Sequence, residues 1–133
     1  MELRVAVVAD EAHTDRQGKV TITGIFHRVQ AATFPAQHLK AALVFLFDAG
    51  PWDLGARELR VDFVDEDAEL LLRFEVQMDV DISGGSMPGA VILPIPSIPL
   101  PKPGQYTFEA FLDGQHRASI PLDAMLRPSG QSA

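Results

Sequence analysis

The chain has no cysteine, one tryptophan and one tyrosine, and its basic residues are fewer than its acidic ones, 11 against 18. The lack of cysteine excludes disulfides, thiolate metal sites and thiol nucleophiles. The formal net charge is -7, and the basic residues are scattered along the chain. This argues against a nucleic-acid partner, because phosphate binding needs a clustered cationic surface.

Long apolar runs are also absent, and none approaches the roughly 20 residues that a membrane-spanning helix needs. The opening, MELRVAVVADEAHTD, has an apolar patch at Val5–Ala9 followed directly by acidic residues. A secretory signal has a cationic start and a longer apolar segment. We therefore expect a cytoplasmic protein that makes no membrane contact.

With 133 residues and 47% hydrophobic content, the chain can bury its own core. We expect one domain over residues 1–126 and a flexible tail over 127–133.

Apolar and polar residues alternate with a period of two along the chain, which is typical of strands. No window of helical length keeps a stripe of apolar residues at helical spacing. In residues 70–82, apolar Leu72 and Phe74 alternate with Arg73 and Glu75, which predicts a strand with one face in water. Strands are expected over 2–9, 19–26, 40–48, 57–64, 70–82, 90–98, 105–112 and 116–122, with a helical turn at 10–15 or 35–40. Repeated short strands predict an all-β fold, an antiparallel β-sandwich of about seven to eight strands, immunoglobulin-like or jelly-roll-like.

Apolar pairing predicts the register of the last hairpin, TFEAFLDGQHRASI. A two-residue turn at 113–114 would set Phe108 opposite Ser119 and mix apolar with polar partners. We therefore expect a three-residue loop, 112–114, with Phe108 facing Ala118. The other expected partners are Tyr106 with Ile120, Glu109 with Arg117 and Thr107 with Ser119.

Charge pairing predicts the register of the acidic hairpin, RVDFVDEDAELLLRFEV. When Phe63 faces Leu72, Asp62 lies opposite Arg73, and Arg60 lies opposite Glu75. A shift by two residues would place like charges opposite each other, which is unfavourable. We expect the first register, with residues 66–69 as the loop and each ion pair on an exposed face.

Five prolines punctuate LPIPSIPLPKPG. Proline cannot donate to a strand ladder and belongs at sheet edges. We expect an edge strand paired up to about Ser97, followed by a polyproline-like crossover. The alternative is a proline-rich ligand for an aromatic groove of a partner.

Several groups are candidates for chemistry, and each has a simpler structural interpretation. Asp62 and Glu75 resemble an acid/base pair, but an arginine partner would keep each ionised. The acidic loop is a candidate calcium site that lacks the spacing of an EF-hand. Its candidate ligands are Asp65, Glu66, Asp67 and Glu69. The histidines His13, His27, His38 and His116 form no metal-binding spacing. The stretch SGGSMPG, residues 83–89, lacks the features of a phosphate loop and is expected to be a flexible connection.

Two surface regions are candidates for binding. AALVFLF, residues 41–47, is apolar at both parities, so one side can fill the core while the other faces outward. The outward residues Ala42, Val44 and Leu46 are the candidate interface of a homodimer, and the alternative is that residues 27–39 fold back as a cover, with Val29 and Phe34 as the lid. Trp52 either caps one end of the sandwich or stacks on a ligand. The candidate ligand rim consists of Asp48, Trp52 and Asp53.

Three longer motifs carry a resemblance: VVADEAHTDRQGKVTITGIFHRV, the pair Phe34-Pro35, and PGQYTFEAFLDGQHRASIPL. Together they cover most of the chain and resemble a family of uncharacterised bacterial β-sandwich proteins of unknown function. The resemblance implies a bacterial β-sandwich and brings no catalytic residue with it.

The sequence therefore predicts a non-enzymatic cytoplasmic β-sandwich that acts through protein–protein contact or self-assembly, without a cofactor. The partner is expected to be a second copy or another protein. A second hypothesis is a small-ligand or carbohydrate-binding sandwich that uses the Trp52 rim. A third is a metal-assisted hydrolase built from Asp10, His13 and Asp15.

Overall fold

The computed structural model describes residues 1–80 and 88–128. These residues form strands in two sheets, so the expected all-β class is confirmed. The strands are β1 (Glu2–Thr14), β2 (Val20–Ile25), β3 (Arg28–Ala31), β4 (Ala36–Asp48), β5 (Gly55–Val64), β6 (Leu70–Val80), β7 (Pro88–Leu100), β8 (Gly104–Leu112) and β9 (Gln115–Leu126). Within the described ranges the one helical element is a short 3-10 turn, η1 (Pro51–Asp53). The helical turn expected at 10–15 or 35–40 is wrong, because β1 and β4 extend through these segments.

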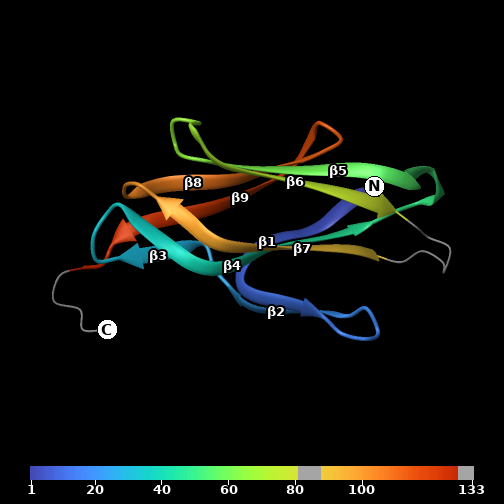
Figure 1. Ribbon diagram of the computed structural model, residues 1–133, viewed down its shortest axis with the longest axis horizontal. Helices are drawn as coiled ribbons and strands as arrows, with labels where there is room; N and C mark the ends of the chain where they lie inside the picture. Colours follow the sequence, from blue (N-terminus) through green and yellow to red (C-terminus); the bar gives the residue numbers. More distant parts are fainter. Residues whose placement is uncertain (81–87, 129–133) are drawn as a thin grey trace.

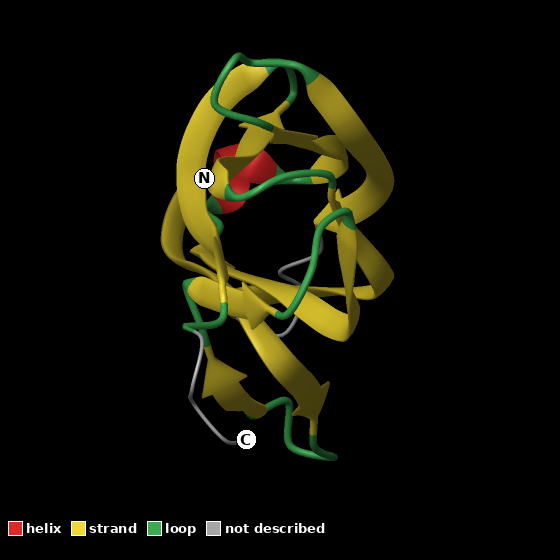
Figure 2. Ribbon diagram, turned by 90° about the vertical axis from the view of Figure 1, so that its left-hand side faces the viewer, coloured by secondary structure: helices red, strands yellow, loops and turns green. Residues whose placement is uncertain are grey.

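The two sheets differ in size and lie one above the other (Figure 1). Sheet A has the order β2-β1-β4-β7, and sheet B has the order β3-β9-β8-β5-β6. All neighbouring strands are antiparallel except β3, which pairs with β9 in parallel. The sequence did not predict β3, since its four residues are too few to show a period and its partner is distant in the chain. Figure 2 shows the strands curving around the space that the core side chains fill.

The core lies between the sheets and takes alternate residues from nearly every long strand. Phe45 of β4, Phe63 of β5 and Phe108 of β8 are all fully buried. The rings of Phe63 and Phe108 lie 4.5 Å apart, and Tyr106 stacks on Phe63 at 5.4 Å. Each such side chain stabilises the fold by about 1.5–3 kcal/mol relative to its exposed state. The period-two pattern therefore predicted the correct inner face of these strands.

The register of the β5–β6 hairpin is confirmed. Phe63 faces Leu72, Asp62 faces Arg73, and Arg60 faces Glu75. A shift in register after Phe63 leaves residues 65–69 as the loop, one residue longer than expected.

The register expected for the β8–β9 hairpin is wrong. The turn has two residues, 113–114, and both have positive φ, 50° and 83°. Phe108 nevertheless faces Ile120, because a bulge at Arg117 restores the apolar pairing beyond the turn. The observed partners are Tyr106 with Leu122, Thr107 with Pro121, Glu109 with Ser119 and Ala110 with Ala118. The hairpin therefore has both the two-residue turn that Asp-Gly favours and the pairing of apolar residues, and Arg117 is left without a partner in the ladder.

The proline-rich segment forms β7, which lies at the edge of sheet A as expected. Its pairing with β4 runs from Pro88 to Leu100, so the strand continues past Ser97. The chain then passes from sheet A to β8 in sheet B. Of the connection expected over 83–89, residues 83–87 lie outside the described residues, and Pro88 and Gly89 belong to β7. Residues 129–133 of the expected tail also lie outside the described residues.

Candidate functional site

The candidate interface residues lie on the side of β4 that faces away from the core. Leu43 and Phe45 belong to the core cluster between the sheets, and the alternate residues do not. Ala42 and Val44 are nevertheless buried, at 5% and 0% exposure, and Leu46 is half-buried. Of the three candidate interface residues, Leu46 is therefore the one that solvent reaches most.

The neighbours of these residues on β1 and β7 are apolar too. The pairing of β1, β4 and β7 gives three rows, which are Val5, Leu46 and Ala90, then Val7, Val44 and Ile92, then Ala9, Ala42 and Pro94. We call these residues the outer apolar face. No charged or polar side chain interrupts the rows, and exposure rises from the fully buried Val44 to the exposed Ala90 and Pro94. The outward-facing apolar positions of residues 41–47 are thus part of an apolar face that extends over three strands.

The cover expected from residues 27–39 is wrong. Val29 and Phe34 pack against the core cluster between the sheets, and residues 28–31 form β3 at the far edge of sheet B. Phe26 contacts His38 at a ring distance of 4.9 Å. The segment therefore closes the core and does not lie over the outer apolar face.

The Trp52 rim combines one exposed ring with two paired carboxylates. Trp52 is 82% exposed, so it does not cap the end of the fold. The next residue, Asp53, is buried and accepts hydrogen bonds from the Gly50 N–H at 2.7 Å and from the Met1 amino group at 2.9 Å. These donors, the Gly50 N–H first, lower the pKa of Asp53 below its ordinary value. Asp48 pairs with Arg4, so both carboxylates of the rim already have partners.

The residues proposed for a metal-assisted hydrolase do not converge. Asp10 lies against Gly24, His13 pairs with Thr21, and Asp15 accepts hydrogen bonds within its own turn. In the acidic loop, Asp65 is likewise held by backbone N–H groups of its own turn. Among the residues that the structure describes, no group of three or more His, Asp or Glu side chains could hold a metal ion.

The expected charged ladder on sheet B is partly confirmed. Arg73 donates two hydrogen bonds to Asp62, at 2.8 and 3.2 Å, which raises the pKa of Arg73. Asp62 is only 8% exposed, however, although an exposed pair was expected. Arg60 approaches Asp62 at 3.6 Å and lies over the Phe111 ring at 4.3 Å, so its contacts are to these residues rather than to Glu75 opposite.

A second polar cluster, of Glu109, His116 and Ser119, was not predicted from the sequence. The Ser119 hydroxyl donates to Glu109 at 2.6 Å, and His116 Nε2 contacts both Glu109 and the Ser119 hydroxyl. In a Ser-His-Asp triad the acid and the serine contact opposite ring nitrogens. Here both contact the same nitrogen, so the histidine does not lie between the acid and the serine. The bulge at Arg117 creates this cluster, and the assumed regular register concealed it.

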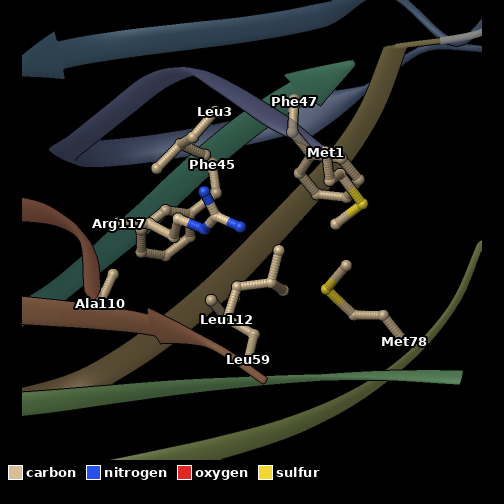
Figure 3. A pocket seen from close by; sticks show the side chains of 9 residues that line it. All are labelled: Met1, Leu3, Phe45, Phe47, Leu59, Met78, Ala110, Leu112 and Arg117. Carbon is tan, nitrogen blue, oxygen red and sulfur yellow. The ribbon is translucent and has the colours of Figure 1, made fainter. Parts of the chain in front are cut away.

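An apolar pocket lies between the two sheets (Figure 3). Sheet A contributes Leu3 and the rings of Phe45 and Phe47, and Met1 lies beside them. Sheet B contributes Leu59, Met78, Ala110, Leu112 and Arg117. Its cavity volume is about 20 Å³, which is room for about one water molecule. Among the described residues that line this pocket, Arg117 is the one with a charged side chain.

Comparison with known proteins identifies the family of this chain. Residues 4–125 match the model of a family described as "Family of unknown function (DUF6941)", and the chain belongs to this family. A search of curated proteins finds no match. Within the described residues, no helix is long and apolar enough to cross a membrane.

Proposed function

For this member of a family of unknown function, we propose a non-enzymatic role in protein–protein contact, with the outer apolar face of sheet A as the contact surface. The partner that we propose first is a second copy of the chain, since two-fold pairing is the commonest form of oligomer. The alternative partner is another protein that offers a complementary apolar surface.

The observation that carries this proposal is the continuity of apolar side chains across β1, β4 and β7. When one face of a sheet is exposed to water, its strands normally carry polar residues at every second position, on that face. Contiguous apolar surface usually marks a contact site. The face also lacks charge, so two copies can meet there without like-charge repulsion despite the net charge of -7.

The test is the solution mass of the protein at several concentrations. We expect the wild type to be dimeric at high micromolar concentration, and Leu46→Asp and Ile92→Asp to be monomeric. Both replaced side chains are half-buried, so the variants should fold, which circular dichroism can check. Gln37→Asp on the same strand is the matched control, because Gln37 is exposed and lies outside the outer apolar face. A wild type that is monomeric at this concentration overturns the self-association proposal.

A ligand-binding role for the Trp52 rim is the second candidate, and the 82% exposure of the ring favours it. Aromatic rings of this kind stack on sugars and bases. Trp52 is the only tryptophan, so quenching of its fluorescence in a titration with simple sugars tests the role directly. Unchanged fluorescence at millimolar sugar removes the carbohydrate hypothesis.

Three finer assignments belong to this proposal and rest on the sequence alone. The family resemblance implies a bacterial source, and the lack of cysteine favours a cytoplasmic location. We also propose that the two sheets form a sandwich of the immunoglobulin-like or jelly-roll-like type.

A further inference from the structure

The strand β6 gives sheet B a long free edge. It is the last strand in the order of the sheet, and within the described residues it pairs with β5 alone. It runs for 11 residues without proline or glycine. By contrast, β7 is interrupted by prolines, β3 has four residues, and β2 has six, one of which is a glycine at positive φ. The N–H and C=O groups on the free side of an edge strand are a template for a further strand. Of the strands that end the two described sheets, β6 is therefore the best suited to accept one.

The apolar residues of β6 are less well covered than their neighbours on β5. Leu72 and Phe74 pack against the core but are half-buried, whereas their partners Phe63 and Val61 are fully buried. The two rows share one face of sheet B, but β5 lies between two strands and β6 has a strand on one side. A strand added beside β6 would lie next to this half-buried row. Burial of its remaining apolar surface would favour the association.

The polar side of β6 carries two acidic groups that have no cationic partner. Arg73 is held by Asp62 of β5 through two hydrogen bonds. Glu75 and Asp79 are exposed, and neither makes an ion pair with the described residues. Like charges opposite each other on neighbouring strands are unfavourable, and opposite charges stabilise the pair. The free edge therefore disfavours an acidic strand and favours a basic one.

We propose that the edge of β6 binds an extended segment of another protein, in which apolar residues alternate with lysine or arginine. The backbone of this segment continues the ladder of sheet B. Its apolar residues lie beside Phe74 and Val76, and its cations lie beside Glu75 and Asp79. In this mode of binding the main-chain hydrogen bonds supply affinity and the side chains supply specificity. The site is separate from the outer apolar face of sheet A and does not depend on self-association.

The test is a titration of the full chain with a short synthetic peptide of alternating lysine and valine, followed through the NMR signals of the backbone amides. We expect the amide signals of β6 to shift and their exchange with solvent to slow. The amide signals of β2, at the edge of sheet A, should stay unchanged. Three control peptides should bind much more weakly. One has glutamate in place of lysine, one has the same composition with the lysines grouped at one end, and one has a central proline, which cannot donate to the ladder.

The double variant Glu75→Gln, Asp79→Asn should weaken binding of the lysine–valine peptide about three- to tenfold, the range expected from two exposed ion pairs. The double variant Glu2→Gln, Glu11→Gln removes the same charge from exposed positions of β1 and should bind as the wild type does. Leu46→Asp should also bind the peptide, which separates this site from the outer apolar face.

The proposal is overturned if the β6 signals do not move at millimolar peptide, if the peptide with grouped lysines binds as tightly, or if the two double variants bind equally. It is also overturned if the Leu46→Asp variant associates with itself through β6, because the occupant of the edge is then a second copy of the chain.

Discussion

Ala68 occupies, in the β5–β6 turn, the position that Gly18 occupies in the β1–β2 turn. In each turn the first aspartate, Asp15 or Asp65, accepts hydrogen bonds at 2.8 or 2.9 Å from the backbone N–H groups two and four residues later. The fourth residue is left-handed in both, with φ of 80° at Gly18 and 62° at Ala68. The same turn is therefore built once with the residue that suits it and once with a residue that is strained there.

Ala68→Gly should raise the free energy of unfolding by about 0.5–1 kcal/mol, because glycine adopts positive φ without a steric cost. Gly18→Ala should lower it by a similar amount, about 1 kcal/mol. Urea denaturation measures both. Ala56→Gly is the control, since Ala56 lies in β5 outside the positive-φ positions of the described residues, and glycine there should destabilise the protein. A destabilised Ala68→Gly variant would contradict the turn assignment.

The sequence predicted most strands and one hairpin register because period-two alternation and opposite charges act between neighbours in the chain. Asp62 and Arg73 illustrate this, as they are joined by a short loop and meet as expected. Two features came from distant parts of the chain and escaped prediction. The strand β3 exists only through its parallel pairing with β9. The bulge at Arg117 reconciles a local turn preference with an apolar register, and neither signal alone indicates it.

The candidate interface shows a similar limit. The doubly apolar pattern of β4 placed Val44 on the outward face, but it did not indicate that Val44 is completely buried and lies between Val7 and Ile92 of the neighbouring strands. Pairing between strands that are far apart in the sequence decides how much of such a face water can reach. This is why the extent of the outer apolar face could not be derived from residues 41–47 alone.

The ion pair between the buried Asp62 and the exposed Arg73 gives a second prediction. Asp62→Asn should lower the free energy of unfolding by about 1–2 kcal/mol, because the buried carboxylate accepts two hydrogen bonds from Arg73. Arg60 also loses its anion, and its Nε is already buried without a hydrogen-bond partner. Glu75→Gln is the control, since Glu75 is exposed on β6, and it should change stability by less than about 0.5 kcal/mol. Thermal or urea unfolding distinguishes the two, and equal effects would show that the burial of Asp62 contributes nothing.

The turn of the β8–β9 hairpin predicts a pH dependence. Asp113 accepts a hydrogen bond from the Glu58 N–H at 3.0 Å and pairs with Arg57 at 3.0 Å. Both contacts, the Glu58 N–H first, lower the pKa of Asp113 below its ordinary value of 3.8. A carboxyl group whose pKa is lower in the folded state stabilises the protein fully above its unfolded pKa, and this stabilisation is lost as the pH falls through the folded pKa. The effect should therefore be present at pH 7 and decline once the pH drops below about 4.

Asp113→Asn isolates this charge, because asparagine tolerates the positive φ of the turn. We expect the variant to be less stable than the wild type at pH 7, by less than about 1 kcal/mol, since the Asp113 side chain is 41% exposed and solvent screens the pair. The difference should be smaller at pH 2.5, because protonation of the wild-type carboxyl group removes its charge as the pH falls. Urea unfolding at the two pH values measures it, with Asp79→Asn on the exposed face of β6 as the control. A difference that stays constant between the two pH values would mean that the carboxylate charge is not the source of the stabilisation.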